Sequence, residues 1–346
     1  MNFWEKLKKP ILALAPMADV TDAAFRYVIA KNSDIEHVTW TEFVSADGLA
    51  RAPEEGRKKL LKDLEYSELE RPIVAQFFTS NPAHMEKAAQ LALELGFDGV
   101  DINMGCPDKS VEKQGAGAAL MKDPKLAREL IKAAKRGVEG KIPISVKTRL
   151  GYNKDELETL LPELLAEEPA VITIHARTRA EMSKVPARWE RVVRAVQIRN
   201  AIQTSPPTPL LGKERGKRGE VFSYPTLIFG NGDVIGIDHA RGLVAETGAD
   251  GVMLGRAIFG NPFLFRKTPP TPEEKIRALI EHTNLFEQKF RAPLVNGKSF
   301  SVMKKHFKAY LSGLSGAKPL LENLIQSENA GQVEELLITY LHESLM

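Results

Sequence analysis

Residues 99–107 read GVDINMGCP, a short apolar run that ends in Asn, Met, Gly, Cys and Pro. A run of this length between glycines is typical of a buried strand rather than of a helix. Further along, Pro124–Val138 has the 3.6-residue apolar spacing of an amphipathic helix, with Asp123 before it and Gly137 near its end. A strand followed by a helix is the unit from which parallel sheets are built.

The same unit recurs along most of the chain. Eight apolar runs are predicted as strands: Ile11–Met17, His37–Phe43, Pro72–Phe78, Gly99–Gly105, Pro143–Leu150, Ala170–Thr178, Thr226–Asp233 and Gly251–Ala257. Further helical patterns between them are Pro82–Leu95, Asp155–Glu167 and His239–Thr247. Eight strand–helix units that close on themselves form a (β/α)8 TIM barrel, so we expect an α/β fold of this type over residues 1–268.

Two segments interrupt the alternation. Thr204–Gly219 is rich in Pro, Gly and basic residues, which predicts a flexible insertion. Its basic residues could touch nucleic acid, but a tolerated surface insertion is the favoured interpretation. After Pro269 only helical patterns remain, which predicts an all-helical C-terminal domain over residues 269–346. Its expected helices are Pro272–Phe290, Val302–Leu314 and Gln332–Leu345.

Composition excludes several classes of protein. The 346 residues are 43% hydrophobic and 27% charged with a net charge of +3, which is typical of a globular chain and not of a disordered one. The single cysteine, Cys106, excludes an intramolecular disulfide and a cysteine-based zinc site. No apolar run approaches the ~18 residues of a membrane span. We therefore expect a cytoplasmic protein without a metal site, and a monomer.

Charge is uneven in the C-terminal part. Between Gln288 and Leu321 every charged residue is basic: Lys289, Arg291, Lys298, Lys304, Lys305, Lys308 and Lys318. Such segregation indicates a phosphate-binding face, and a solvated basic surface is an equally good interpretation.

Functional groups in a TIM barrel gather where the strands end. Polar and small residues follow the predicted strands at Pro16-Met17-Ala18-Asp19, Gln76, Asn103 with Cys106, Lys147 with Arg149, His175 with Arg177, Gly230-Asn231-Gly232-Asp233 and Gly255-Arg256. The last two sets follow strands seven and eight, where this fold commonly binds phosphate.

Three of these residues leave alternatives open. Lys147 interrupts an apolar strand, so it faces either an anionic ligand, such as a reduced flavin, or a carboxylate such as Asp101. Cys106 is presented by a Gly-Cys-Pro turn and could act as a nucleophile or as a proton donor. His175 could serve as its base, bind a ligand, or have a structural role.

At these residues the sequence resembles the tRNA-dihydrouridine synthases. The matching segments are Ala15–Asp22, Gln76, Asp101–Pro107 with Gly115 and Gly117, Val146–Arg149, His175–Arg179, Gly230–Asp233, Gly255–Ala257, Lys305-His306 and Gly316–Lys318. The resemblance implies an FMN-dependent barrel with a helical tRNA-binding domain. The activity it implies is reduction of a uridine in tRNA to 5,6-dihydrouridine with NADPH or NADH.

The resemblance also implies roles. Hydride would pass from flavin N5 to uracil C6, and Cys106 would protonate C5. The residues expected to bind FMN are Pro16, Met17, Ala18, Gln76, Lys147, His175, Asn231, Gly232, Asp233, Gly255 and Arg256. The residues expected to bind the tRNA substrate are Asn103, Arg177, Lys304, Lys305 and Lys308.

The sequence departs from the family pattern in three places. Ala176 stands where members often have Gly, Glu181–Arg188 differs from the commoner bacterial patterns, and Thr204–Gly219 has no recognised counterpart. Two rival functions are an FMN barrel that acts on a small molecule and a non-catalytic RNA-binding protein.

Overall fold

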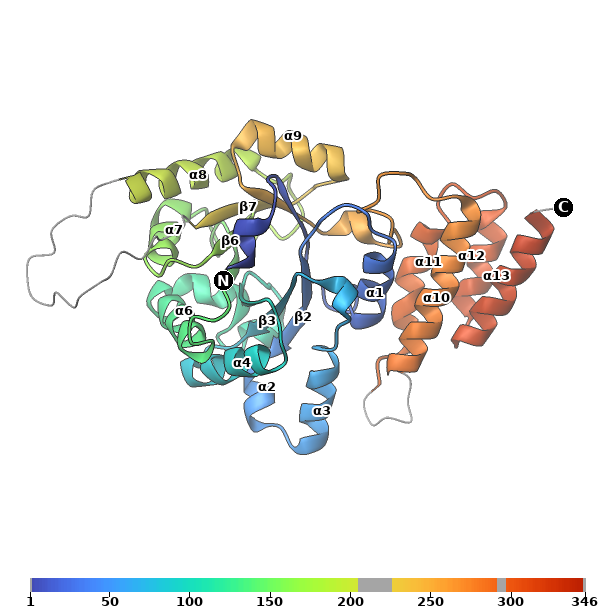
Figure 1. Ribbon diagram of the computed structural model, residues 1–346, viewed down its shortest axis with the longest axis horizontal. Helices are drawn as coiled ribbons and strands as arrows, with labels where there is room; N and C mark the ends of the chain where they lie inside the picture. Colours follow the sequence, from blue (N-terminus) through green and yellow to red (C-terminus); the bar gives the residue numbers. More distant parts are fainter. Residues whose placement is uncertain (1, 205–225, 291–296, 345–346) are drawn as a thin grey trace, which may run out of the picture. The chain divides into compact units, whose positions relative to one another are not determined.

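The computed structural model describes residues 2–204, 226–290 and 297–344 (Figure 1). In this part of the chain eight strands form one sheet, in the order β1-β8-β7-β6-β5-β4-β3-β2. A parallel bridge between Ala13 and Val38 brings the two ends of that order together. The predicted α/β fold of the TIM-barrel type, with helices at its C-terminal end, is confirmed.

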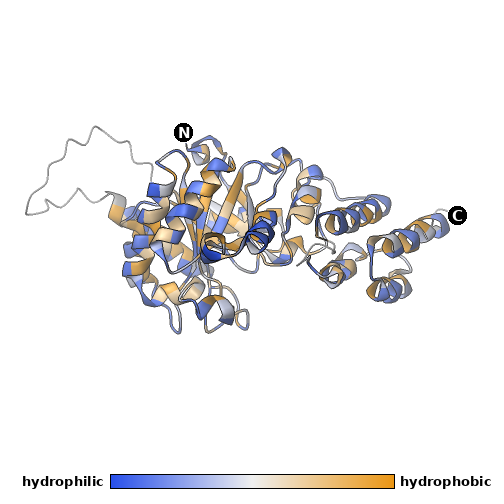
Figure 2. Ribbon diagram, turned by 90° about the horizontal axis from the view of Figure 1, so that it is seen from below, coloured by the Kyte–Doolittle hydropathy of each residue, from blue (hydrophilic) through white to orange (hydrophobic). Residues whose placement is uncertain are grey.

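The eight predicted strands are all present, with slightly shorter or shifted bounds. They are β1 (Ile11–Leu14), β2 (Thr39–Ser45), β3 (Ile73–Phe78), β4 (Gly99–Met104), β5 (Ile144–Arg149), β6 (Val171–His175), β7 (Leu227–Asn231) and β8 (Gly251–Leu254). Figure 2 shows the strands mainly in the orange of apolar residues, while the helices carry hydrophilic residues on one side.

The helices between the strands are α1 (Ala23–Lys31), α2 (Ala46–Arg51), α3 (Glu54–Lys62), α4 (Pro82–Glu94), α5 (Lys109–Glu112), α6 (Pro124–Gly137), α7 (Leu157–Leu165), α8 (Trp189–Thr204) and α9 (Ile237–Thr247). The C-terminal helices are α10 (Pro272–Phe290), α11 (Lys304–Tyr310), α12 (Ala317–Gln326) and α13 (Ala330–Ser344). Short 3-10 helices are η1 (Phe3–Lys6), η2 (Glu68–Glu70), η3 (Gly117–Lys122), η4 (Arg256–Ile258) and η5 (Phe300–Met303). The predicted insertion Thr204–Gly219 lies, from residue 205 on, outside the described residues.

The described chain divides into two compact units. Unit 1 consists of Met1–Ile11, Phe77–Asp233 and Arg241–Met253. Unit 2 consists of Leu12–Gln76, Val234–Ala240 and Leu254–Met346. Unit 2 therefore contains both the first strands of the sheet and the C-terminal helices.

In unit 1 the strand register decides which side chains meet. Strands β4, β5 and β6 are parallel and place Asn103 beside Lys147, and Lys147 beside Thr173. One row further on, Arg149, His175 and Asn231 are register neighbours. Residues two apart on a strand face the same side, so polar groups of both rows collect at the carboxyl ends of these strands.

Helices α4 and α6 pack closely in unit 1. The apolar stripe of α6 is buried, and the Asp123 side chain accepts a hydrogen bond from the Leu126 N–H at its start. A Cβ at Gly137 would come within 2.2 Å of the Glu86 carbonyl oxygen on α4, so only glycine allows this approach.

In unit 2 the C-terminal helices α10–α13 lie side by side (Figure 1), and α10 packs on α1. The Phe25 ring of α1 stacks on the His282 ring of α10 at 4.6 Å. Arg26 of α1 forms a fully buried ion pair with Glu70 of η2, with 2.8 Å between Nε and Oε2. None of the helices in the described part of the chain is long and apolar enough to cross a membrane.

The helix predictions for this part were partly wrong. Helix α10 has the predicted bounds, but Val302–Leu314 is a 3-10 turn followed by the shorter α11. Helix α12 was not predicted. The described structure buries its Leu320 and Leu324, and Gly316 and Pro319 at its start read as a turn in the sequence.

Candidate active site

The turn that carries Cys106 follows β4 and is held from two sides. The Asn103 side-chain oxygen accepts hydrogen bonds from the backbone N–H of Gly105 (3.1 Å) and of Cys106 (2.9 Å). From β5, the Arg149 Nε donates to the Gly105 carbonyl oxygen at 2.7 Å. Asparagine commonly stabilises turns in this way. The half-buried thiol is therefore presented by a fixed backbone.

The segment at Gly117 also packs against the Cys106 turn. The Ala118 N–H donates to the Cys106 carbonyl oxygen at 2.9 Å. Gly117 has a φ of +59°, and a Cβ there would lie 2.8 Å from that carbonyl oxygen. Both the backbone conformation and the space require glycine at this position.

The environment of Cys106 keeps its thiol protonated. Burial raises the pKa of Cys106, and the negative charge of Asp108 adds to this effect, while the Asp108 backbone, Arg149 and Lys147 oppose it. A thiol with a raised pKa is a poor nucleophile at neutral pH and remains able to donate a proton.

Lys147 projects from the middle of β5 towards β7. Its Nζ lies 3.3 Å from the Asn231 Oδ1, and the Asn231 Nδ2 donates to the Met253 carbonyl oxygen at 2.7 Å. Burial, helped by Arg149, lowers the pKa of Lys147 to about 8. The alternative partner Asp101 acts on Lys147 through its charge, but its carboxylate accepts the Ser145 hydroxyl at 2.5 Å.

His175 and Arg177 meet at the end of β6. An Arg177 Nη lies 3.2 Å from the His175 Nε2, and another Nη pairs with the Asp233 carboxylate. The Arg177 Nε also donates to the Val185 carbonyl oxygen at 2.5 Å. Asp233 accepts the Ala187 N–H at 2.8 Å. Arg177 and Asp233 thus tie the loop 181–188 to the ends of β6 and β7.

Gly232 lies against the His175 ring. Its φ is +123°, and a Cβ would come within 2.8 Å of the Ala187 Cβ and 3.1 Å of the His175 Cδ2. A side chain at this position would therefore fill the space beside the imidazole.

The remaining predicted cofactor residues belong to unit 2. In the turn after β1 Pro16 is buried, Met17 is half-buried and Ala18 is exposed, and the Met17 N–H donates to the Thr21 hydroxyl at 2.9 Å. A Cβ at Gly255 would touch the Met17 sulfur at 3.7 Å, which is an ordinary contact. Gln76 is fully buried in β3, and Arg256 is exposed.

The tail lysines of unit 2 face solvent. On α11, Lys305 and Lys308 are exposed and Lys304 is half-buried, and none of the three forms an ion pair within the described residues. Lys305, Lys308 and Lys275 line a cavity of about 550 Å³ together with Gly260 and Asn261. None of the described residues that line it is acidic.

Comparison with known proteins identifies the family. The family model described as Dihydrouridine synthase (Dus) matches residues 13–205 and 221–344. The chain belongs to this family. It is similar to "Probable tRNA-dihydrouridine synthase 2" of Bacillus subtilis (strain 168), with 35% identity over 97% of this chain and 95% of the relative. "Probable tRNA-dihydrouridine synthase" of Staphylococcus aureus (strain COL) is 34% identical over 97% of this chain and 94% of the relative.

The family resemblance expected from the sequence is therefore confirmed, and with it the expectation of a dihydrouridine synthase enzyme. Solved structures agree in fold. Histamine dehydrogenase from Rhizobium sp. 4-9 is 11% identical with a TM-score of 0.50, covering 79% of this chain and 48% of that one. An amine oxidase for 6-hydroxypseudooxynicotine from Pseudomonas geniculata N1 is 13% identical with a TM-score of 0.51, covering 86% and 52%.

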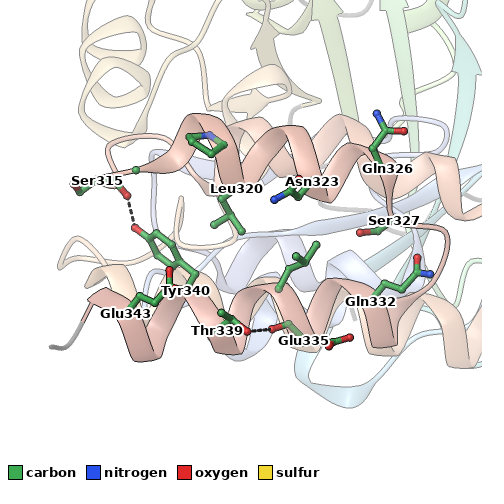
Figure 3. A pocket seen from close by; sticks show the side chains of 13 residues that line it. Ser315, Leu320, Asn323, Gln326, Ser327, Gln332, Glu335, Thr339, Tyr340 and Glu343 are labelled. Carbon is green, nitrogen blue, oxygen red and sulfur yellow. Dashed lines mark hydrogen bonds between the residues drawn. The ribbon is translucent and has the colours of Figure 1, made fainter.

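A larger cavity of about 1120 Å³ lies between α12 and α13 in this member of the family (Figure 3). Glu335 and Glu343 line it, and the Tyr340 hydroxyl donates to the Ser315 carbonyl oxygen at 2.6 Å. Because its charged lining is acidic, this cavity does not suit a phosphate-bearing ligand.

The sequence alone indicates no role for Arg149, and Lys298 stands out there only as one of the basic tail residues. Arg149 lies two residues after Lys147 on β5, and that spacing could have indicated that both side chains face the same side as Asn103. No local pattern marks Lys298, because its partners lie far away in the sequence.

Proposed function

We propose that this protein reduces a uridine of tRNA to 5,6-dihydrouridine, with FMN as cofactor and NADPH or NADH as reductant. The observation that carries the proposal is Cys106, a protonated thiol on a fixed turn at the end of a barrel strand. The similar Bacillus subtilis protein is named a probable tRNA-dihydrouridine synthase, and this name supports tRNA as the substrate.

The residues proposed to hold FMN are Pro16, Met17, Ala18, Gln76, Lys147, His175, Asn231, Gly232, Asp233, Gly255 and Arg256. Their chemistry fits this group. A partly buried Lys147 suits an electron-rich ring system, and Gly232 lets the backbone after β7 approach His175 closely, where a Cβ would come within 3.1 Å of the ring. FMN reduced by NADPH or NADH would supply the hydride, from N5 to C6 of the uracil.

The chain supplies the second half of the reduction. Cys106 gives its proton to C5, so that hydride and proton together saturate the C5–C6 bond, and the thiolate then regains a proton from water. Asn103 and Arg149 orient the thiol by fixing the backbone on both sides of it. We assign Asn103 and Arg177 to the uracil side of the site. In the described structure, the Asn103 side chain bonds to the Cys106 turn and the Arg177 side chain bonds to the loop 181–188.

We assign tRNA binding to residues 269–346, and the catalytic barrel to residues 1–268. Lys304, Lys305 and Lys308 would contact phosphates, because lysines that reach solvent and form no ion pair within the described residues can exchange bound counterions for the RNA backbone. The cavity that Lys275, Lys305 and Lys308 line, with no acidic residue among its described lining, gives a second support for Lys305 and Lys308.

The test replaces Cys106 and separates chemistry from binding. The purified protein should show a flavin absorption spectrum. Cys106→Ala should lower the rate of dihydrouridine formation by about 10²–10⁴-fold, because a general acid contributes that much. Bound flavin and tRNA affinity should remain as in the wild type. Cys106→Ser, which keeps the shape but is a weaker acid, should be nearly as slow.

Full activity of Cys106→Ala would remove the proton-donor role. A wild-type protein that takes up no flavin on reconstitution would contradict the proposal as a whole. Sequencing tRNA from a deletion strain would identify the uridine that this enzyme modifies.

A further inference from the structure

Lys298 lies inside a cluster of carboxylates in unit 2. Its Nζ is 2.5 Å from the Glu42 Oε2, 3.5 Å from the Asp63 Oδ1 and 3.8 Å from the Asp19 Oδ1. The fourth acid, Asp22, is buried and acts on Lys298 through its charge. We call Asp19, Asp22, Glu42 and Asp63 the carboxylate cluster.

The members come from distant parts of the chain. Asp19 belongs to the turn after β1, Glu42 to β2, and Asp63 follows α3. Lys298 precedes η5 in the C-terminal tail. A single tail residue therefore contacts three segments of the barrel portion of unit 2.

The contact differs from the surface ion pairs of the same tail. The Lys298 side chain is 16% exposed and that of Glu42 6%, whereas the pair Lys289–Glu65 is 30% and 50% exposed. Buried charges of this kind are costly unless they are paired, and removing one partner leaves the others uncompensated.

Glu42 links Lys298 to the backbone of the β1 turn. One carboxylate oxygen contacts the Lys298 Nζ, and the other accepts the Asp19 N–H at 2.6 Å. Asp19 has a φ of +56°, a left-handed conformation that non-glycine residues adopt only when their surroundings hold them there. The surroundings here are Glu42 on the Asp19 N–H and Lys298 near its carboxylate.

The charges agree with this picture. Burial alone would lower the pKa of Lys298, but the negative charges of Glu42 and Asp63 outweigh this effect and raise it. Burial and the neighbouring Glu42 raise the pKa of Asp22 to about 6. The cluster thus holds more negative charge than its surroundings tolerate easily, and among the described residues Lys298 is the cation within 4 Å of three of its members. Arg26, the other cation that acts on the cluster, is bound to Glu70.

We propose that Lys298 is a positioning residue, which holds the turn Pro16–Asp19 in its cofactor-binding conformation through Glu42 and Asp19. The inference rests on the proposed function, since that function assigns Pro16, Met17 and Ala18 to FMN. It also means that the tail, besides holding RNA, contributes to flavin binding.

The test measures FMN affinity of the full-length apoprotein by quenching of flavin fluorescence. Lys298→Met should weaken FMN binding at least 10-fold, Lys298→Arg should stay within about 3-fold of the wild type, and Lys289→Met should leave it unchanged. Hydrogen exchange of a peptide covering residues 15–22 should be faster in Lys298→Met apoprotein, which a loss confined to α10–α13 would not produce.

A double variant separates positioning from charge balance. Lys298→Met with Glu42→Gln restores the net charge of the cluster, and the Gln oxygen can still accept the Asp19 N–H. It should regain thermal stability while FMN affinity stays low. Wild-type FMN affinity in either the folded single variant or the double variant would overturn the proposal.

Failure of the two proposals can be told apart. If the wild type binds FMN and Lys298→Met binds it equally well, only the positioning role fails. If the wild type binds no FMN, the proposed function fails and this inference fails with it.

Discussion

Basic side chains in unit 1 and in the tail of unit 2 differ in what surrounds them. Lys147, Arg149 and Arg177 are largely enclosed and bonded to named protein atoms, an Asn231 oxygen, a Gly105 carbonyl and the Asp233 carboxylate. Lys305 and Lys308 on α11 are exposed and form no ion pair within the described residues. Both groups carry the same charge, but only the first has a fixed position.

The difference indicates a division of work. Chemistry at one C5–C6 bond needs charges and a proton donor held at fixed positions, since prearranged groups cost no reorganisation during the reaction. Binding a flexible polyanion needs solvated charges that can release counterions. Lys298 does not follow this division, because it is a tail residue with the environment of a buried site cation.

Among changes to these basic side chains, the largest effect should come from removing the fixed cation of unit 1. Lys147→Met should lower the rate of dihydrouridine formation by about 10²–10³-fold, the usual loss when one prearranged charge is removed. The exposed Lys141→Met is the matched control and should retain the wild-type rate. An active Lys147→Met variant would contradict the distinction between fixed and solvated cations.

The same residue predicts a pH dependence. Because the folded pKa of Lys147 is about 8 against an ordinary value of 10.5, the cation is present below pH 8 and is lost above it. The wild-type rate should therefore fall above about pH 8, and Lys147→Arg should keep its own rate to higher pH. Between pH 8 and 10.5 the unfolded chain binds more protons, so this group makes the free energy of unfolding rise with pH.

Changing the solvated cations should affect binding alone. Replacing Lys304, Lys305 and Lys308 together by Gln should weaken tRNA binding by about 10–100-fold and reduce the slope of log affinity against log salt by about 2–3. The turnover rate at saturating tRNA should not change. Helix α3 offers a control with identical spacing, Lys58, Lys59 and Lys62, whose replacement should change affinity much less. Equal losses in both triples would show that total charge, and not the tail, binds RNA.

A smaller effect tests how rigid the Cys106 turn must be. Gly117→Ala should lower the free energy of unfolding by about 2–4 kcal/mol, since it combines left-handed strain with a clash against the Cys106 carbonyl. It should also slow turnover. Gly140 has a φ of +70° with nothing within 4 Å of a new Cβ. Gly140→Ala should therefore cost only about 1–2 kcal/mol, with wild-type turnover. Urea unfolding and steady-state kinetics of both variants decide this.

The smallest expected effect is a gain in stability in unit 2. Asp22→Asn keeps the cap of α1 and removes a buried charge beside Glu42. Because the pKa of Asp22 is raised in the folded state, its ionisation destabilises the fold as pH rises through about 6. The variant should be about 1–2 kcal/mol more stable than the wild type at pH 8, and the difference should vanish near pH 4. Thermal unfolding at the two pH values measures it.

The strands could be predicted because each is an apolar run between turn residues. Strands buried on both faces are continuous apolar runs of this kind. Helix α12 was missed because its first turn contains Pro319, which a helix tolerates only at its start, and because two leucines make a weak stripe. Local sequence patterns thus located elements with a continuous apolar run, and they missed a helix that has only a weak apolar stripe.

The sequence indicates where the candidate site residues lie along the strands, but it does not reveal their contacts. Cys106 follows the end of β4 and His175 ends β6, as the alternation of elements predicts, while Lys147 lies two residues before the end of β5. That Asn103 fixes the Cys106 turn, and that Arg177 pairs with Asp233, depends on side-chain conformations that no spacing reveals. The direct ligand roles given to these residues remain predictions.

The single cysteine offers a direct experimental use. Because Cys106 is the only thiol in the chain, a thiol-alkylating reagent labels one known atom without any engineering. Its raised pKa and its half-buried place make that labelling slow. The labelling rate therefore measures how often the turn between Asn103 and Arg149 opens, and adding tRNA or flavin to the reaction would reveal which of them covers the thiol.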